Sequence, residues 1–466
     1  MTNPKYNINR RRFISQASCA AIGSTTLFNT LLNLKAMNAA AIANSSTLIS
    51  GNYKALVCLT LGGGNDSFNM LIPTETNAYT DYANSRSNLA IDSAAVLPLN
   101  GVNLGLHPEL TDVQNLFNDN KVAFISNIGT LIEPTTKTEF YNDTVDIPLG
   151  LYSHADQFQQ WQTSVPHDRV NIGWGGKVAD LIDSMNNNDN ISMNVSLNGA
   201  NIFQRGIDTV EYSVHPYDGS IGILGFDDPN DLQLAKKIAS DNMIEASYAD
   251  AFKQTYVDVI KVSRDAHIEF SDAIDNVAPF STVTFSDNDL SQSFNMVAKT
   301  IAARDTLSFQ RQIFFIELNG FDMHDELLVA HSDAMRMVND ALHEFTLAME
   351  ELNIDDCVTT FTMSEFSRTL TSNGNGTDHA WGANVLVMGG GVNGGSIYGT
   401  YPSLALDGPA EVGGGVLIPD ISTDEYFAEL ALWFGVDATD LSTIFPNIGN
   451  FFDTNSGVMP YGFLNL

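Results

Sequence analysis

Lys54–Leu61 reads KALVCLTL, and the sequence GGGND follows at once at positions 62–66. The eight residues are almost all apolar and too few for a helix, and the glycines end the run abruptly. This pattern is typical of a strand that is buried on both faces. Strands of this kind occur in α/β proteins, where helices cover both faces of a largely parallel sheet.

Similar apolar runs recur along the chain, with stretches of helical spacing between them. Further strands are expected at 122–126, 312–318, 357–363 and 384–388. Helical spacing marks 108–118, a stretch from 153, 174–185, 230–276, 290–307, 326–352 and 424–434. This alternation predicts a three-layer α/β/α fold with a mostly parallel central sheet. Because we find no internal repeat and no long linker, we expect residues 44–466 to form one domain.

The N-terminus has the pattern of an export signal. Arg10, Arg11 and Arg12 precede a weakly apolar stretch, and an alanine-rich run suited to cleavage ends near Ala43. These features resemble a twin-arginine signal peptide over residues 1–43, which predicts passage through the twin-arginine export machinery and a periplasmic or secreted protein. No later apolar run approaches the roughly 18 residues that a membrane span requires, so stable membrane insertion is not expected.

The charge balance is strongly acidic. The 466-residue chain has 55 acidic and 22 basic residues, a formal net charge of −33. Residues 1–43 carry five basic and no acidic side chains, so the remainder carries −38. Such a field repels nucleic acid, which we therefore exclude as a partner. A solvated acidic surface is the plain explanation, and a salty environment or binding of divalent cations is the alternative.

Polar side chains gather where the expected strands end. In open parallel sheets, ligand sites form beyond the carboxyl ends of the strands. Carboxylates and imidazoles at such a rim are suited to a divalent ion such as Zn, Mn, Ca or Mg, whose identity the sequence leaves open. The candidate metal ligands are Asp66, Asp322, His324, Glu365, Asp378 and His379.

Several of these residues also have a structural explanation. Asp66 is equally suited to a turn, Asp322 and His324 to a helix cap and a surface position, and His379 to a loop. The glycines at 62–64 lack both the P-loop lysine and the spacing of a dinucleotide fingerprint, which argues against nucleotide binding and an NAD-type oxidoreductase. Ser153 is either a plain helix N-cap or a nucleophile at a helix start that favours anions.

Taken together and in order, these motifs resemble the exported bacterial family of unknown function numbered fifteen-oh-one. That family looks like a branch of the alkaline phosphatase and sulfatase superfamily, which implies an alkaline-phosphatase-like fold. The resemblance spans roughly residues 53–435. The motifs that carry it are Gly62–Met70, Ser153-His154, Gly173-Trp174, Gly320–His324, Met363–Thr369 and Gly376–His379.

The resemblance implies roles for particular residues. Asp66 takes the position of the aspartate after the first strand, and Ser153, with His154 beside it, that of the nucleophile. Glu365 stands where the aspartate of an Asp-His pair is expected, and Arg368 becomes a candidate for substrate binding. The sequence departs from the superfamily at Phe366, which stands where a second metal-binding histidine is expected, so one of two metal sites is in doubt.

Two functions follow from this pattern. The first is an exported metal-dependent hydrolase acting on phosphate or sulfate esters, in a small molecule or an acidic polymer. The second is a non-catalytic exported binding or assembly protein that keeps the fold. Bound metal and ester hydrolysis distinguish the two.

Overall fold

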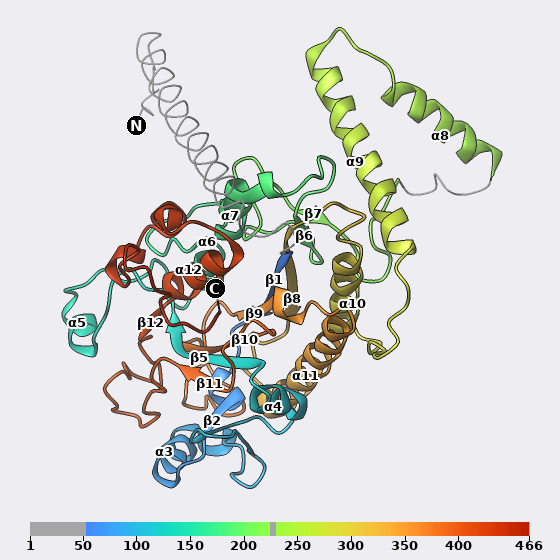
Figure 1. The fold of residues 1–466 in the computed structure, drawn as a ribbon. Coiled ribbons are helices and arrows are strands. Elements are labelled where there is room, and N and C mark those ends of the chain that lie inside the picture. The colour runs from blue at the N-terminus through green and yellow to red at the C-terminus, as the bar shows by residue number, and fades with distance from the viewer. Residues whose placement is uncertain (1–52, 224–229, 466) are drawn as a thin grey trace, which may run out of the picture.

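The computed structural model describes residues 53–223 and 230–465 (Figure 1). The predicted export signal, residues 1–43, lies outside the described residues. No helix within the described ranges is both long and apolar enough to cross a membrane.

The core of the molecule is a nine-stranded sheet. Its strand order is β11-β5-β10-β9-β1-β8-β6-β7, with β12 also paired to β5. Every strand except β10 runs in the same direction. The strands are β1 (Lys54–Gly62), β5 (Val122–Gly129), β6 (Asn194–Ser196), β7 (Tyr212–Ser213), β8 (Arg311–Asn319), β9 (Val358–Met363), β10 (Ala383–Met388), β11 (Ser396–Tyr398) and β12 (Ile421–Ser422).

Strand β1 lies between β8 and β9 and is buried along nearly its whole length. Cys58 pairs with Phe315 on one side and Phe361 on the other, so apolar side chains continue across the sheet in one row. Burial on both faces explains why the sequence of β1 is uniformly apolar rather than alternating.

Helices cover both faces of the sheet (Figure 1). On one side α4 (Thr111–Asn118), α10 (Asp289–Ala302) and α11 (Leu327–Glu351) pack together, with Phe294 against Phe345. On the other side lie α6 (His154–Thr163), α7 (Trp174–Ile182) and α12 (Thr423–Phe434), where Trp174 stacks on Phe427 at 4.6 Å. The predicted three-layer α/β arrangement with a mostly parallel sheet is therefore confirmed.

The remaining elements lie around this core. They include α2 (Ser67–Met70), α3 (Thr76–Arg86), α5 (Lys137–Asn142), α8 (Asp231–Ile244), α9 (Ala251–Asp275) and α13 (Leu441–Ile444). A small antiparallel sheet has the order β2-β4-β3, formed by β2 (Leu71–Pro73), β3 (Leu97–Pro98) and β4 (Leu104–Leu106).

All five expected strands are present, but the weaker elements were missed. The sequence pattern gave no sign of α3, the small sheet, or the short strands β6, β7, β11 and β12. The helical stretch expected at 230–276 is two helices, α8 and α9.

The reversed direction of β10 matters for the site. In a fully parallel sheet, residues that precede a strand lie at the opposite edge from residues that follow its neighbours. Because β10 runs antiparallel to β9 and β5, the segment just before it lies at the carboxyl ends of the other strands. Thr377, Asp378 and His379 thereby join the loops that follow β1, β8 and β9.

Candidate metal centre

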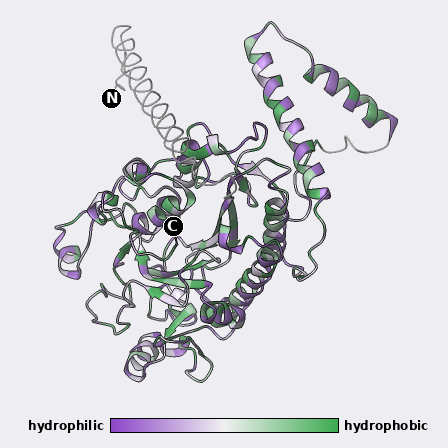
Figure 2. Cartoon of the chain, viewed as in Figure 1, coloured by the Kyte–Doolittle hydropathy of each residue, from purple (hydrophilic) through white to green (hydrophobic). Residues whose placement is uncertain are grey.

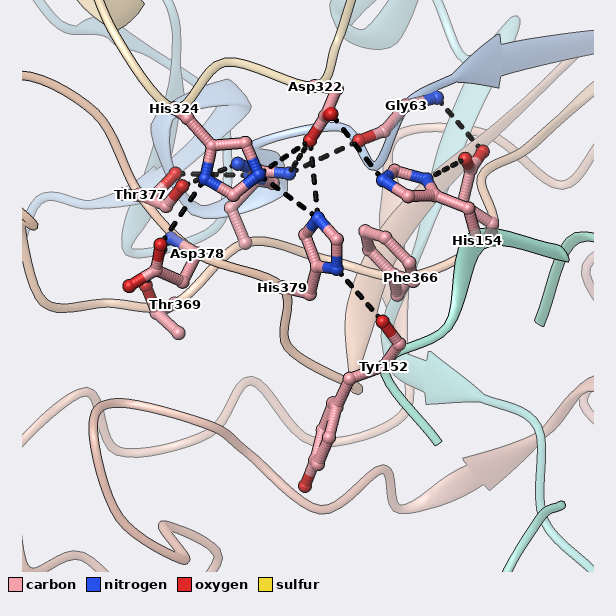
Figure 3. A network of polar contacts seen from close by, with 12 residues as sticks. Gly63, Tyr152, His154, Asp322, His324, Phe366, Thr369, Thr377, Asp378 and His379 are labelled. Carbon is pink, nitrogen blue, oxygen red and sulfur yellow. Dashed lines mark hydrogen bonds and ion pairs between the residues drawn. The ribbon is translucent and has the colours of Figure 1, made fainter. Parts of the chain in front are cut away.

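Three histidines and one aspartate meet at this rim (Figure 3). The Nε2 atoms of His324 and His379 lie 3.0 and 3.3 Å from Oδ1 of Asp322. Nε2 of His154 lies 3.5 Å from Oδ2 of the same carboxylate. One ligand atom from each of His154, Asp322 and His379 falls within 4.8 Å of the others.

Each imidazole is held through its other nitrogen. Nδ1 of His154 lies 2.8 Å from Oε1 of Glu365, Nδ1 of His379 lies 2.9 Å from the carbonyl oxygen of Tyr152, and Nδ1 of His324 lies 3.3 Å from Oδ1 of Asp378. Carboxylate and carbonyl oxygens only accept, so the tautomer with its proton on Nδ1 satisfies each of these three contacts. In that tautomer of the neutral rings the three Nε2 atoms are unprotonated and lie toward Asp322.

Two of these bare nitrogens face each other. Nε2 of His324 and Nε2 of His379 are 3.1 Å apart, which two acceptors without a shared proton or cation do not favour. A tetrahedral ion bonded at about 2.0–2.1 Å holds its ligand atoms about 3.3 Å apart. The separations of 3.0–3.5 Å between the imidazoles and Asp322 fit such an ion. The residues thus fit a zinc-like centre, with Nδ1 partners of the kind that orient metal-binding histidines.

Asp322 is oriented by Arg368. Nη1 of Arg368 donates to Oδ1 of Asp322 at 2.7 Å and to the carbonyl of Gly63 at 3.3 Å, while Nε and Nη2 each donate to Thr377. Burial raises the pKa of Asp322, but the hydrogen bond and charge of Arg368, helped by His324 and His154, outweigh it and lower the pKa. Arg368 is fully buried, and its guanidinium is occupied within the protein rather than turned toward a substrate.

The glycines of the motifs allow the loops to approach closely. A Cβ at Gly63, where φ is +114°, would lie 2.3 Å from the backbone nitrogen of Asp322, and one at Gly376 would lie 2.2 Å from the backbone of His324. Side chains at these positions would therefore push apart the loops that carry the cluster.

Phe366 closes one side of the cluster. Its ring stacks on His379, with centroids 4.5 Å apart, and lies 4.9 Å from the ring of His154. The position where the sequence led us to expect a second metal-binding histidine is thus occupied by a buried aromatic ring that packs against two of the imidazoles.

The other predicted site residues lie around the cluster rather than within it. Glu365 accepts from His154 and from the Gly63 N–H, and Asp378 accepts from His324. Ser153 is the N-cap of α6, where its hydroxyl accepts from the Asp156 N–H at 3.5 Å. The next residue, His154, is the one that enters the cluster.

Asp66 has a different environment. It is buried in an ion pair with Arg86, and its Oδ1 has no hydrogen-bond partner. Burial raises its pKa, although the charges of Arg86 and Arg368 oppose that effect. Arg86 also donates to the carbonyl of Thr369 at 2.9 Å, so the pair ties α3 to the loop after β9.

Sequence reasoning missed two parts of this arrangement. It did not single out Arg86, which lies in a helix that the pattern did not predict. It also missed Tyr152, which takes part through its backbone carbonyl, a group present at every position and therefore invisible to a motif. The positive φ of Tyr152, 71°, aims that carbonyl and had no signal in the sequence.

Comparison with known proteins gives one family and several distant structures. Residues 53–441 match the model of the family described as Protein of unknown function (DUF1501). No curated protein matches the chain.

Among solved structures, the PsFucS1 sulfatase from Pseudoalteromonas sp. is 9% identical over 87% of this chain and 71% of that chain, with a TM-score of 0.34. Ps i-CgsB is 10% identical over 86% and 77%, with a TM-score of 0.35. The lipoteichoic acid synthase LtaP from Listeria monocytogenes is 10% identical over 67% and 56%, with a TM-score of 0.23. With TM-scores below 0.5, none of these likenesses assigns an activity to this chain.

Proposed function

This chain belongs to the DUF1501 family, and from that premise we propose that it is a metal-dependent hydrolase of phosphate or sulfate esters. The observation that carries the proposal is the 3.1 Å approach of Nε2 of His324 to Nε2 of His379, beside the carboxylate of Asp322. A divalent cation between these atoms would satisfy the constellation. Its ligands would be His154, Asp322 and His379, and His324 beside them would be the fourth.

Each residue then has a task in binding or orientation. Glu365 and the Tyr152 carbonyl fix the tautomers of His154 and His379, and Arg368 holds Asp322 ionised and in place. A bound divalent ion supplies Lewis acidity toward an ester oxygen. Asp322 is 45% exposed, so a substrate has access to the cluster from solvent.

The net negative charge of the protein bears on how an anionic ester would be attracted to the cluster. An anionic ester would be repelled by a protein with a net charge of −33 unless a local positive charge intervenes. Because the guanidinium of Arg368 is occupied, the divalent ion itself would be the charge that attracts the ester.

The second candidate is a non-catalytic, exported binding or assembly protein with one structural ion. The packing of Phe366 against His154 and His379 favours it, since this ring leaves the predicted second metal position without an imidazole. A single ion held by four side chains would then be a structural centre.

The experiment compares metal content and hydrolysis in the purified protein. We expect about one divalent ion per chain after loading with Zn, Mn, Ca or Mg, and turnover of p-nitrophenyl phosphate, bis-p-nitrophenyl phosphate or p-nitrophenyl sulfate. H379A and D322N should lose both. H215A is the matched control. His215 does not belong to the cluster, and its Nδ1 lies 3.0 Å from Oδ2 of Asp218. Bound metal without turnover supports the non-catalytic candidate, and absence of metal from the wild type contradicts both.

Two nucleophiles are compatible with an active enzyme. Ser153 precedes His154 at the start of α6, and a solvent water is the alternative. Loss of turnover in S153A with metal content retained would identify the serine, whereas retained turnover would identify water.

We further propose that the protein is exported to the periplasm or secreted. The pattern of residues 1–43 supports this location. Replacing Arg11 and Arg12 by lysine should leave the protein in the cytoplasm of its host, which cell fractionation would detect. Unchanged export of that variant would contradict the twin-arginine route.

A further inference from the structure

Helices α8 and α9 extend away from the body of the molecule (Figure 1). We call residues 231–264 the arm; it contains α8 and the outer half of α9. Figure 2 shows apolar residues along both helices of this projection. Its exposed large apolar side chains are Leu232, Leu234, Ile238, Met243, Phe252, Tyr256, Val259 and Val262.

One apolar stripe runs along α9 with alternating spacings of four and three residues. Its apolar positions are 252, 256, 259, 266, 270 and 273, and the polar Ser263 occupies the one remaining position of this spacing. The inner part is buried against the body through Ala266, Phe270 and Ala273. The outer part is bare, with Phe252 89%, Tyr256 68% and Val259 64% exposed.

Helix α8 does not cover this outer part. Its end is joined to α9 by ion pairs, from Lys261 to Glu245 and from Arg264 to Asp241 and Glu245. A spacing of 3.5 residues is the pattern by which one helix packs along another. The outer stripe therefore continues an interface that the inner half of the same helix already makes, but without a partner.

The arm also differs from the rest of the chain in charge. Residues 231–264 carry five acidic and five basic side chains, so the whole formal charge of −33 lies outside the arm. Two copies of the body repel each other strongly, whereas two arms do not. The arm is thus the surface through which two such acidic molecules can meet.

We propose that the arm is a self-association surface, on which α9 of a second copy packs antiparallel along Phe252, Tyr256 and Val259. In this isologous arrangement Tyr256 of one copy lies opposite Val259 of the other. The inference goes beyond the proposed function and does not depend on it.

Charge selects the antiparallel direction. Within α9, residues 251–264 carry three basic and one acidic side chain, whereas residues 265–275 carry four acidic and no basic side chains. With Tyr256 opposite Val259, antiparallel pairing lays residues 251–264 of the two copies along each other and keeps the acid-rich roots and the bodies at opposite ends. Parallel pairing would place tip against tip and the two acidic bodies side by side.

The first test is sedimentation velocity of the full protein over a concentration series. We expect a monomer–dimer equilibrium that strengthens with added salt, because salt screens the repulsion between the bodies. The double variant F252E/V259E should raise the dimer dissociation constant about tenfold or more. V329E is the matched control, because Val329 is 69% exposed on α11 and should leave the dimer unchanged.

Folding and competing occupants are checked in the same samples. Both replaced residues of the double variant are well exposed, so its circular dichroism and metal content should equal those of the wild type. A wild-type protein that stays monomeric up to about 100 μM would overturn the proposal. A monomer that floats with phosphatidylcholine vesicles would overturn it in favour of a lipid surface.

The second test reports orientation. Oxidation of a mixture of Y256C and V259C should give a disulfide-linked dimer of the two variants in higher yield than either variant alone. Wild type is the background control, because Cys58 is buried and Cys357 is partly buried. Cross-linking that is strongest within each separate variant would overturn the antiparallel arrangement.

Discussion

Two aspartates follow neighbouring strands at the same rim and end in opposite environments. Asp66 comes four residues after β1, and Asp322 three residues after β8, where Gly62 pairs with Asn319. Asp66 is buried against Arg86, whereas Asp322 is 45% exposed among three imidazoles. The local sequence is similar, so the partner that each carboxylate meets across the fold decides its role.

The comparison shows how one rim holds both a buried, ion-paired carboxylate and one that is exposed to solvent. Arg86 neutralises Asp66 in the core and ties α3 to the loop after β9. Asp322 instead shares one arginine, Arg368, with backbone groups and leaves its carboxylate open to the imidazole nitrogens. A buried pair fixes loops, and a half-exposed one can bind a ligand from solvent.

The largest effect is expected from breaking the buried pair. R86M leaves Asp66 buried without its cationic partner, and we expect a loss of about 3–5 kcal/mol in the free energy of unfolding. Urea denaturation of variant and wild type at the same pH measures this loss. The double variant R86M/D66N should recover much of it, because no unpaired charge is left in the core.

The pH dependence of R86M provides the control. Without the arginine the pKa of Asp66 is raised further, since burial already raises it in the wild type. A raised carboxyl pKa destabilises the fold as pH rises above the unfolded value of about 3.9, so the deficit of R86M should shrink on acidification. A deficit that is constant with pH would argue that lost packing, not charge, is responsible.

A smaller loss is expected from a substitution in the exposed cluster, where carboxylates orient the imidazoles and so affect metal binding. Glu365 accepts from two donors, the Gly63 N–H and His154, and the glutamine of E365Q offers only one oxygen. We expect zinc affinity, measured by competition titration at fixed pH, to fall by about 10–100-fold. The stability of the metal-free protein should change much less than in R86M.

Asp378 gives the matched comparison. It lies 3.3 Å from His324 and is more exposed than Glu365, which lies 2.8 Å from His154. D378N keeps one oxygen that can still accept from the imidazole, so its zinc affinity should fall less than that of E365Q. Equal losses in both variants would contradict the ranking by burial and distance.

The sequence predicted those parts of the fold that local patterns encode. The apolar runs of β1, β8 and β9 predicted a sheet buried on both faces, and polar residues after them predicted a common rim. The rim includes His379 only because β10 runs antiparallel, and strand direction depends on pairing partners distant in sequence. The direction of β10 therefore could not be predicted from any local sequence pattern.

The division between Asp66 and Asp322 was also beyond the sequence. Asp66 was predicted as a metal ligand from its place after a strand, but the structure pairs it with Arg86 instead. Helix α3, which carries Arg86, has a largely polar sequence without a clear apolar face. A buried arginine on such a helix is determined by tertiary packing, which overrides local preference.

The smallest effect is expected at a third carboxylate, which extends the comparison to a buried acid without an ion pair. Asp424 at the start of α12 is fully buried, and its hydrogen-bond partner Ser164 is a neutral hydroxyl at 2.6 Å. Burial raises the pKa of Asp424 to about 7, and the Ser164 hydrogen bond only partly opposes that effect. Its ionisation therefore costs stability as pH rises from the unfolded value of about 3.9 to about 7.

D424N removes that ionisation while keeping an oxygen for Ser164. We expect the variant to melt about 1–3 °C higher than wild type at about pH 8, and the difference to shrink on acidification and vanish below about pH 3, where Asp424 is neutral in both states. S164A is the counterpart, because it removes the partner and should lower the melting temperature. A gain in D424N that is the same at both pH values would mean that Asp424 has the same pKa in the folded and unfolded states, which would contradict the raised pKa of the buried acid.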